Sequence, residues 1–230
     1  MRNLLWKEWH EQSWKLGFGC IVLGALALIG LHSRIVADQT LIIWVNFLGM
    51  TMLPVLSSTG LVPAERGEGS LESLLALPVK PWRILAAKTA MGIALCIGPM
   101  LVAAVVSLLV AGGREMPDSA VVAIYAKSTV ATLSLFIWML ALTIQLPSEA
   151  RAALVGVGLL VFWMLASAGL ADPSVPRWAL AISPFALFYG VADQIAEPLP
   201  AVIVLAVQAG IALGLWIWAS KRLSNLEGQS

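Results

Sequence analysis

Long uncharged runs separated by short polar segments dominate the chain. Six runs approach or exceed the length of about 20 apolar residues with which a helix crosses a bilayer, and they predict spans at about 16–36, 40–62, 86–111, 122–146, 151–171 and 200–220. A seventh window, from Trp178 to Ala192, is shorter and has Pro184 at its centre. Within segment 172–199 we expect it to form a re-entrant or interfacial helical pair, a shape that needs protein or water to satisfy its backbone. The pattern predicts an all-α integral membrane protein in which residues 1–230 form a single transmembrane domain.

Composition agrees with this class. Hydrophobic residues make up 60% of the chain and charged residues 12%, whereas about a quarter of the residues of a soluble domain are charged. A formal net charge of +1 offers no basic excess for nucleic acid. Cys20 and Cys96 both lie inside apolar runs, which excludes a disulfide framework or a CxxC motif and favours small packing residues.

The distribution of basic residues predicts the orientation of the spans. With both termini in the cytoplasm, the inner segments hold Arg2, Lys7, Lys15, Arg66, Lys80, Arg83, Lys88, Arg151, Lys221 and Arg222. The outer segments hold Arg34, Arg114 and Arg177, and Lys127 lies near the outer end of its span. This asymmetry follows the positive-inside rule, which a crossing at Trp178 to Ala192 would break. We therefore expect a multi-pass protein of the inner (plasma) membrane with no cleaved leader.

Residues 1–15 predict an amphipathic helix at the membrane interface. At about 100° per residue, Leu5, Trp6 and Trp9 share one face, while Lys7, Glu8, Glu11 and Lys15 take the other. Tryptophan suits this depth because its ring is apolar and its N–H seeks water. The segment is either a simple anchor or a surface for a cytoplasmic partner.

The loop at 63–82 predicts a second short helix, on the cytoplasmic side. Gly67 and Gly69 break the preceding helix, Ser70 is an N-cap candidate and Glu72 falls in the first turn. The apolar side of this helix consists of Leu71, Leu74, Leu75 and Leu77, and Pro78 and Pro81 end it. Composition alone leaves open whether the helix is an interfacial linker or a docking element.

The same loop resembles the signature of ABC-2 type transporter permeases. The resemblance rests on Glu65, Arg66, Gly69, Ser70, Leu71, Glu72, Leu74, Leu75 and Pro78, followed by Lys88 in the next span. The opening segment with Lys7 and Glu8 is similar to the first helix of that family. Gly67 stands where the family usually has its second Glu, and Ser70 replaces Thr.

The resemblance implies a permease subunit of an exporter that forms one half of a translocation path. A second copy or a paralogue would form the other half, and membrane lipids would surround both. A separate cytoplasmic ATPase would contact a coupling helix at 70–77 and the N-terminal helix. The implied coupling residues are Lys7, Glu8, Glu65, Arg66, Glu68, Gly69, Ser70, Leu71, Glu72, Leu74, Leu75 and Pro78. The chain has no G-x-x-x-x-G-K-[ST] run, so we expect ATP and Mg²⁺ on the partner and no catalytic residue, cofactor or metal site in this chain.

Polar residues inside the spans are candidates for lining the path, because unpaired polar groups are costly in a bilayer. The second span is richest in them, with Asn46, Thr51, Ser57, Ser58 and Thr59. By family likeness, spans two and five face the seam between the two permease halves. Gln145 and Gln208 are expected to form hydrogen bonds between helices.

Other classes of membrane protein fit the sequence less well. The sequence lacks the catalytic groups of an intramembrane hydrolase, since His10 and His32 lie at opposite ends of the first apolar run and no predicted span contains a carboxylate. An ion-driven carrier lacks embedded carboxylates for the same reason. Two alternatives remain: a non-transporting membrane anchor, and a haem-exporter permease of cytochrome c maturation, whose loop is similar. Glu65-Arg66 and Lys7-Glu8 favour the general ABC-2 group over the haem exporter.

Overall fold

The computed structural model describes residues 2–67, 69, 79–111, 116–170, 172, 175–188 and 200–227. In these ranges the chain is helical, with short turns between helices. The helices are α1 (Arg2–Ser33), α2 (Asp38–Thr59), α3 (Pro63–Gly67), α5 (Pro81–Ala111), α6 (Asp118–Thr143), α7 (Glu149–Leu170), α8 (Arg177–Leu180) and α10 (Ala201–Glu227).

Six of the described helices are long and apolar enough to cross a membrane. Their candidate spans are Leu4–Ser33, Asp38–Gly67, Pro81–Ala111, Asp118–Thr143, Glu149–Leu170 and Ala201–Ser224. A helix satisfies its backbone N–H and C=O groups internally, which is the requirement for crossing hydrocarbon. The six spans predicted from run length are confirmed, and the protein is an all-α, multi-pass membrane protein.

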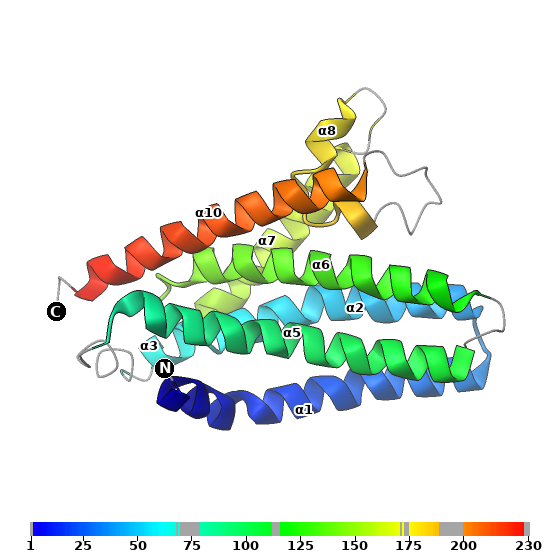
Figure 1. Cartoon of the computed structure of the whole chain (residues 1–230), viewed down its shortest axis with the longest axis horizontal. Coiled ribbons are helices and arrows are strands. Elements are labelled where there is room, and N and C mark those ends of the chain that lie inside the picture. Colours follow the sequence, from blue (N-terminus) through cyan, green and yellow to red (C-terminus); the bar gives the residue numbers. More distant parts are fainter. Residues whose placement is uncertain are drawn as a thin grey trace.

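Helix α5 lies at the centre of the bundle. It packs against α1, α2, α6 and α10, while α2 also contacts α6 and α7. Helices α1, α2, α5 and α6 run side by side, α10 lies along α6, and both termini are at the same end of the bundle (Figure 1). Because α5 also begins at that end, we call it the Lys88 end after a residue of its second turn.

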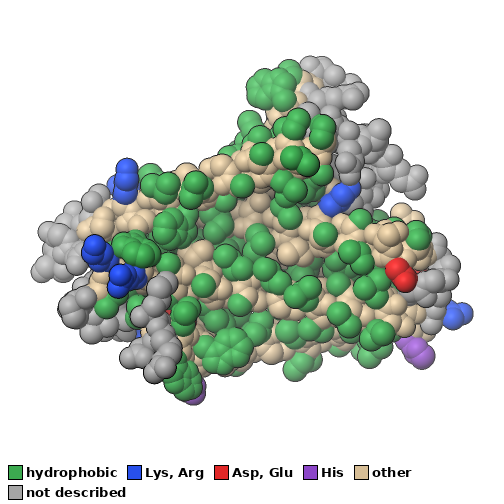
Figure 2. All heavy atoms as spheres, in the orientation of Figure 1, with side chains coloured by type: hydrophobic (Ala, Val, Ile, Leu, Met, Phe, Trp, Pro, Cys, Tyr) green, Lys and Arg blue, Asp and Glu red, His purple; other side chains and the backbone are tan. Residues whose placement is uncertain are grey.

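The outer surface of the bundle is apolar. Hydrophobic side chains cover the visible face along its length, and Lys and Arg gather toward the Lys88 end (Figure 2). Ile21, Leu109, Leu154 and Val202 each expose more than 70% of their surface. An apolar surface of this extent would drive a soluble protein to aggregate, whereas lipid chains solvate it.

The predicted N-terminal helix is continuous with the first span, since α1 runs unbroken from Arg2 to Ser33. Helix α1 contains no proline that would interrupt it between the N-terminal segment and the span. Trp6 and Trp9 are exposed as expected, but Glu8, on the opposite face, is buried against other helices. The polar side of this segment therefore faces protein as well as solvent.

Helix α8 and the turn that follows it lie at the other end of the bundle (Figure 1). After α8 the chain turns through 181–185, and Gln208 Nε2 of α10 donates to the carbonyls of Ala181 (2.8 Å), Ile182 (3.1 Å) and Ser183 (2.9 Å). The Ser183 hydroxyl also contacts the Ser167 hydroxyl of α7. One side chain thus bonds to three carbonyls of a turn, of which the Ser183 carbonyl also accepts from the Ala186 N–H. The sequence predicts a bond between helices for Gln208, and its partners lie in this turn instead. Residues 189–192, the last part of the predicted re-entrant pair, lie outside the described residues.

Replacing Gln208 with leucine is expected to destabilise the protein by about 1–3 kcal/mol, because carbonyls buried at this turn lose a shared donor. Thermal unfolding of the purified protein in detergent measures the effect. Gln145→Leu is the matched control, because the Gln145 side chain is exposed and not, as the sequence predicts, bonded between helices. Equal unfolding temperatures for the two variants would contradict the role of Gln208.

Candidate functional site

Five charged side chains from three helices form an ion-pair network at the Lys88 end. Lys88 Nζ lies 2.8 Å from Glu8 Oε1 and 2.7 Å from Glu65 Oε2. The other Glu65 oxygen, Oε1, accepts a hydrogen bond from Lys7 Nζ at 2.6 Å, and Lys7 Nζ lies 3.4 Å from Glu11 Oε1. Glu65 of α3 therefore joins α1 to α5, in the order Glu11, Lys7, Glu65, Lys88 and Glu8.

The inner part of the ion-pair network is buried. The side chains of Lys88, Glu8 and Glu65 are 1%, 3% and 8% exposed, against 35% for Lys7. An isolated charge at such a depth costs several kcal/mol, so each group depends on its neighbours for compensation. Breaking one pair would strand the others, and the three helices are therefore held in a single relative geometry at this point.

Local sequence explains how the charges meet. Lys7 and Glu11 are one helical turn apart, the spacing at which oppositely charged side chains pair on a helix surface. Helices α3 and α5 both begin at a proline, Pro63 and Pro81, which suits the first helical position. Buried residues near the start of α5, including Ile84 and Leu85, fix its rotation and turn Lys88 inward.

Two further contacts hold the short helix α3 and the turn before it. Arg66 Nη1 donates to the backbone carbonyl of Gln145, beyond the end of α6, at 2.7 Å. Gln12 Nε2 of α1 donates to the carbonyl of Gly60, just after α2, at 3.0 Å. The adjacent residues Glu65 and Arg66 thus bind different parts of the bundle. Glu65 binds α1 and α5, and Arg66 binds the connection between α6 and α7.

The sequence-based coupling residues divide into two groups. Lys7, Glu8 and Glu65 are brought together in the ion-pair network, which Lys88, noted in the same motif, completes. Arg66 contacts the Gln145 carbonyl instead. Gly69 is described, with a positive φ of 73°, a conformation that glycine adopts without strain. The remaining ones, Glu68, Ser70, Leu71, Glu72, Leu74, Leu75 and Pro78, lie outside the described residues.

Sequence reasoning missed three members of this site. Glu11 could have been found from its spacing to Lys7. Gln12 and the carbonyl of Gln145 carry no such signal, because both bind residues that are distant in sequence.

The polar residues of α2 are buried within the protein. Asn46, Thr51, Ser57, Ser58 and Thr59 are each less than 5% exposed, and each donates to a backbone carbonyl three or four residues earlier. Ser57 also lies 3.6 Å from Cys96 Sγ of α5. These bonds to the helix backbone satisfy the hydroxyl groups and Asn46 Nδ2, whereas the buried Asn46 Oδ1 has no hydrogen-bond partner among the described residues. A role of these residues in the path stays a prediction.

Three carboxylates of the ion-pair network, those of Glu8, Glu11 and Glu65, lie within 4.8 Å of one another, close enough to hold a cation. Two cations are already there, because Lys7 and Lys88 bring their ammonium groups to these oxygens. With three negative and two positive charges, the five residues have a net charge of −1. The donor set fits ion pairs with lysine better than it fits a metal ion.

Comparison with known proteins places these residues in a family. No curated protein matches the sequence. The family model described as "ABC-2 family transporter protein" matches residues 8–167, from Glu8 through most of α7 and thus including Glu65 and Lys88. Since the match covers more than half of the chain, the protein belongs to the ABC-2 transporter family, as a membrane permease component of an ABC transporter.

Proposed function

We propose that this permease forms half of an export path and is driven by a separate cytoplasmic ATPase subunit that grips segment 70–77. The observation that carries the proposal is the ion-pair network, which joins α1 to α3 and α5, the helices that precede and follow that segment in the chain. ATP and Mg²⁺ would bind to the partner. A second copy or a paralogue would supply the other half of the path.

The contacts of α3 support a mechanical route between ATPase and spans. Only residue 68 and Gly69 separate α3 from the proposed coupling segment. Glu65 ties α3 to α1 and α5, and Arg66 ties it to the α6–α7 connection. A displacement of segment 70–77 by the ATPase would therefore move three parts of the bundle together, because packed and ion-paired elements shift as units.

The proposed orientation puts the Lys88 end and both termini in the cytoplasm. Basic residues gather toward that end in the structure (Figure 2), and the positive-inside rule favours retaining them on the cytoplasmic side. Cysteines introduced at Lys80 and Asp118 test this directly: an impermeant thiol reagent added outside intact cells should label Asp118→Cys alone.

Replacing Leu74 and Leu75 together with aspartate is expected to abolish stimulation of the ATPase by the permease. Two carboxylates in the apolar face of the coupling segment would have to be desolvated on docking. The free energy of that desolvation exceeds the binding free energy that the contact provides. ATP hydrolysis is measured in proteoliposomes that contain both subunits, together with co-purification of the ATPase.

The matched control is Ala76→Asp, which adds a carboxylate on the side of the same predicted helix opposite its leucines. It should leave both stimulation and co-purification close to wild type. Normal coupling in Leu74→Asp/Leu75→Asp would refute the docking assignment, as would hydrolysis of ATP by the permease purified alone.

A further inference from the structure

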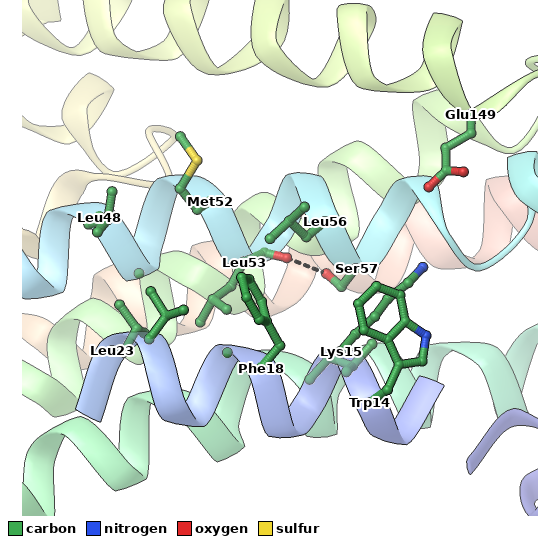
Figure 3. Close-up of a pocket in the computed structure, with 14 residues that line it drawn as sticks. Trp14, Lys15, Phe18, Leu23, Leu48, Met52, Leu53, Leu56, Ser57 and Glu149 are labelled. Carbon is green, nitrogen blue, oxygen red and sulfur yellow. Dashed lines mark hydrogen bonds between the residues drawn. The ribbon is translucent and has the colours of Figure 1, made fainter. Parts of the chain in front are cut away.

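A groove of about 630 Å³ runs along the bundle between α1 and α2. Phe18 and Leu23 of α1 line one side, and Met52 and Leu56 of α2 line the other (Figure 3). Trp14 and Lys15 lie at one end of the groove, with Glu149 of α7 on the same side (Figure 3). The volume is in the range of sites that hold small molecules.

The length of the groove corresponds to one leaflet of a bilayer. Its lining extends from Trp14 to Leu23 on α1 and from Leu48 to Ser57 on α2. At about 1.5 Å of rise per residue this is ~14 Å, while half of the hydrocarbon core is ~15 Å. Lys15 lies toward the Lys88 end and directly precedes the uncharged run that begins at Leu16, so the groove starts at the polar edge of that run.

Polarity is confined to one end of the groove. Phe18, Met52 and Leu56 are exposed and apolar, and the Ser57 hydroxyl already donates to the Leu53 carbonyl at 2.7 Å. Lys15 forms no ion pair within the described part of the chain, and its ammonium lies 5.7 Å from the centroid of the Trp14 ring. Tryptophan with a basic residue is typical of the headgroup level of a membrane.

We propose that this groove binds one phospholipid, with an acyl chain along α1 and α2 and the phosphate at Lys15. The two charged side chains also select the headgroup. Lys15 complements a phosphate, whereas Glu149 repels a purely anionic headgroup and complements an ammonium. A zwitterionic headgroup with a primary ammonium, as in phosphatidylethanolamine, satisfies both, and phosphatidylglycerol satisfies one.

Native mass spectrometry of the purified permease tests the proposal without transport or an ATPase, so it does not depend on the proposed function. At equal added concentrations, phosphatidylethanolamine should bind more tightly than phosphatidylglycerol. Lys15→Ala should weaken binding of both lipids by about fivefold, the contribution of one basic residue that lies near a lipid phosphate. Glu149→Gln should remove the preference between them while retaining binding.

Two variants separate the groove from the general lipid surface. Met52→Trp fills the apolar part and should reduce bound phosphatidylethanolamine, whereas Leu109→Trp, on the exposed surface of α5, should not. Lys15→Arg keeps the positive charge and should bind as wild type does. Binding that is unchanged in both Lys15→Ala and Met52→Trp would overturn the site.

A second permease copy is the competing occupant of the groove. Phe18→Cys tests for it, because efficient disulfide crosslinking of two copies in the membrane would place protein where the proposal places lipid. Absence of crosslinking, together with the lipid preferences above, supports the phospholipid.

Discussion

Replacing Lys88 with methionine is expected to destabilise the folded permease by about 3–5 kcal/mol, the cost of removing one partner from a buried ion pair. Methionine retains much of the side chain's volume and apolar stem, so the loss of stability is due to the removal of the ammonium charge. Glu8 would keep no cationic partner within 4 Å among the described residues, and Glu65 would keep Lys7. The midpoint of unfolding in mixed micelles, followed by tryptophan fluorescence, measures the change.

Lys80→Met is the control for Lys88→Met, because Lys80 is exposed and directly precedes α5, the helix that contains Lys88. It should change stability by less than about 0.5 kcal/mol, as surface substitutions do. A double variant then tests the mechanism: Glu8→Gln in the Lys88→Met background removes the stranded carboxylate and should recover part of the loss. A Lys88→Met protein as stable as Lys80→Met would show that the ion-pair network does not hold the three helices.

The number and type of the spans followed from the sequence because hydrophobic run length is a local property. A bilayer imposes a minimum length on each helix, and six runs meet it. The sequence also separates the two faces of residues 1–15 correctly. It does not show that Glu8 faces α5, because the polar side of a helix can meet either water or a charged neighbour from far along the chain.

The sequence motifs include Lys7, Glu8, Glu65 and Lys88 but not Glu11, and they do not predict the contacts of the ion-pair network. Glu8 and Lys88 are 80 positions apart, and Lys7 and Glu65 are 58 apart. Periodicity fixes which residues share a helix face but not which helix packs there. Only the arrangement of α1, α3 and α5 turns two separate motif fragments into one site.

The polar residues of α2 illustrate the same limit of local pattern. Ser, Thr and Asn inside a span are compatible with two roles, lining a path or packing against other helices. The sequence pattern is the same for both roles. In the structure their side chains return to the carbonyls of their own helix, as Thr51 does to Phe47 at 2.9 Å. A path formed with a second permease copy would have to be lined by other groups or require these to turn outward.

The packing of α5 against α6 depends on a glycine that no sequence pattern marks as special. Gly92 faces the ring of Phe136, and a Cβ at Gly92 would overlap that ring and lie 2.9 Å from Leu61 Cδ1. Phe136 and Leu61 are fully buried, so neither has free space to move into. The close approach of the two helices therefore requires the absence of a side chain at this position.

Replacing Gly92 with alanine is expected to destabilise the protein by about 1–3 kcal/mol, the usual cost of an overpacked core. Helix propensity alone predicts the opposite sign, since alanine in a helix is favoured over glycine by about 1 kcal/mol. Steric overlap decides the sign here because the obstructing atoms belong to a rigid, enclosed ring. The temperature at which half the protein remains monodisperse in size-exclusion chromatography measures the loss.

Gly158→Ala on α7 is the matched control, because nothing lies within 4 Å of the added methyl group. It should be neutral or stabilise by up to about 1 kcal/mol. Phe136→Leu shortens the obstructing side chain, so the double variant Gly92→Ala/Phe136→Leu should lose less stability than the sum of the two single changes. Additive losses would mean that the ring is not what excludes a side chain at Gly92, and that α5 and α6 approach one another closely for another reason.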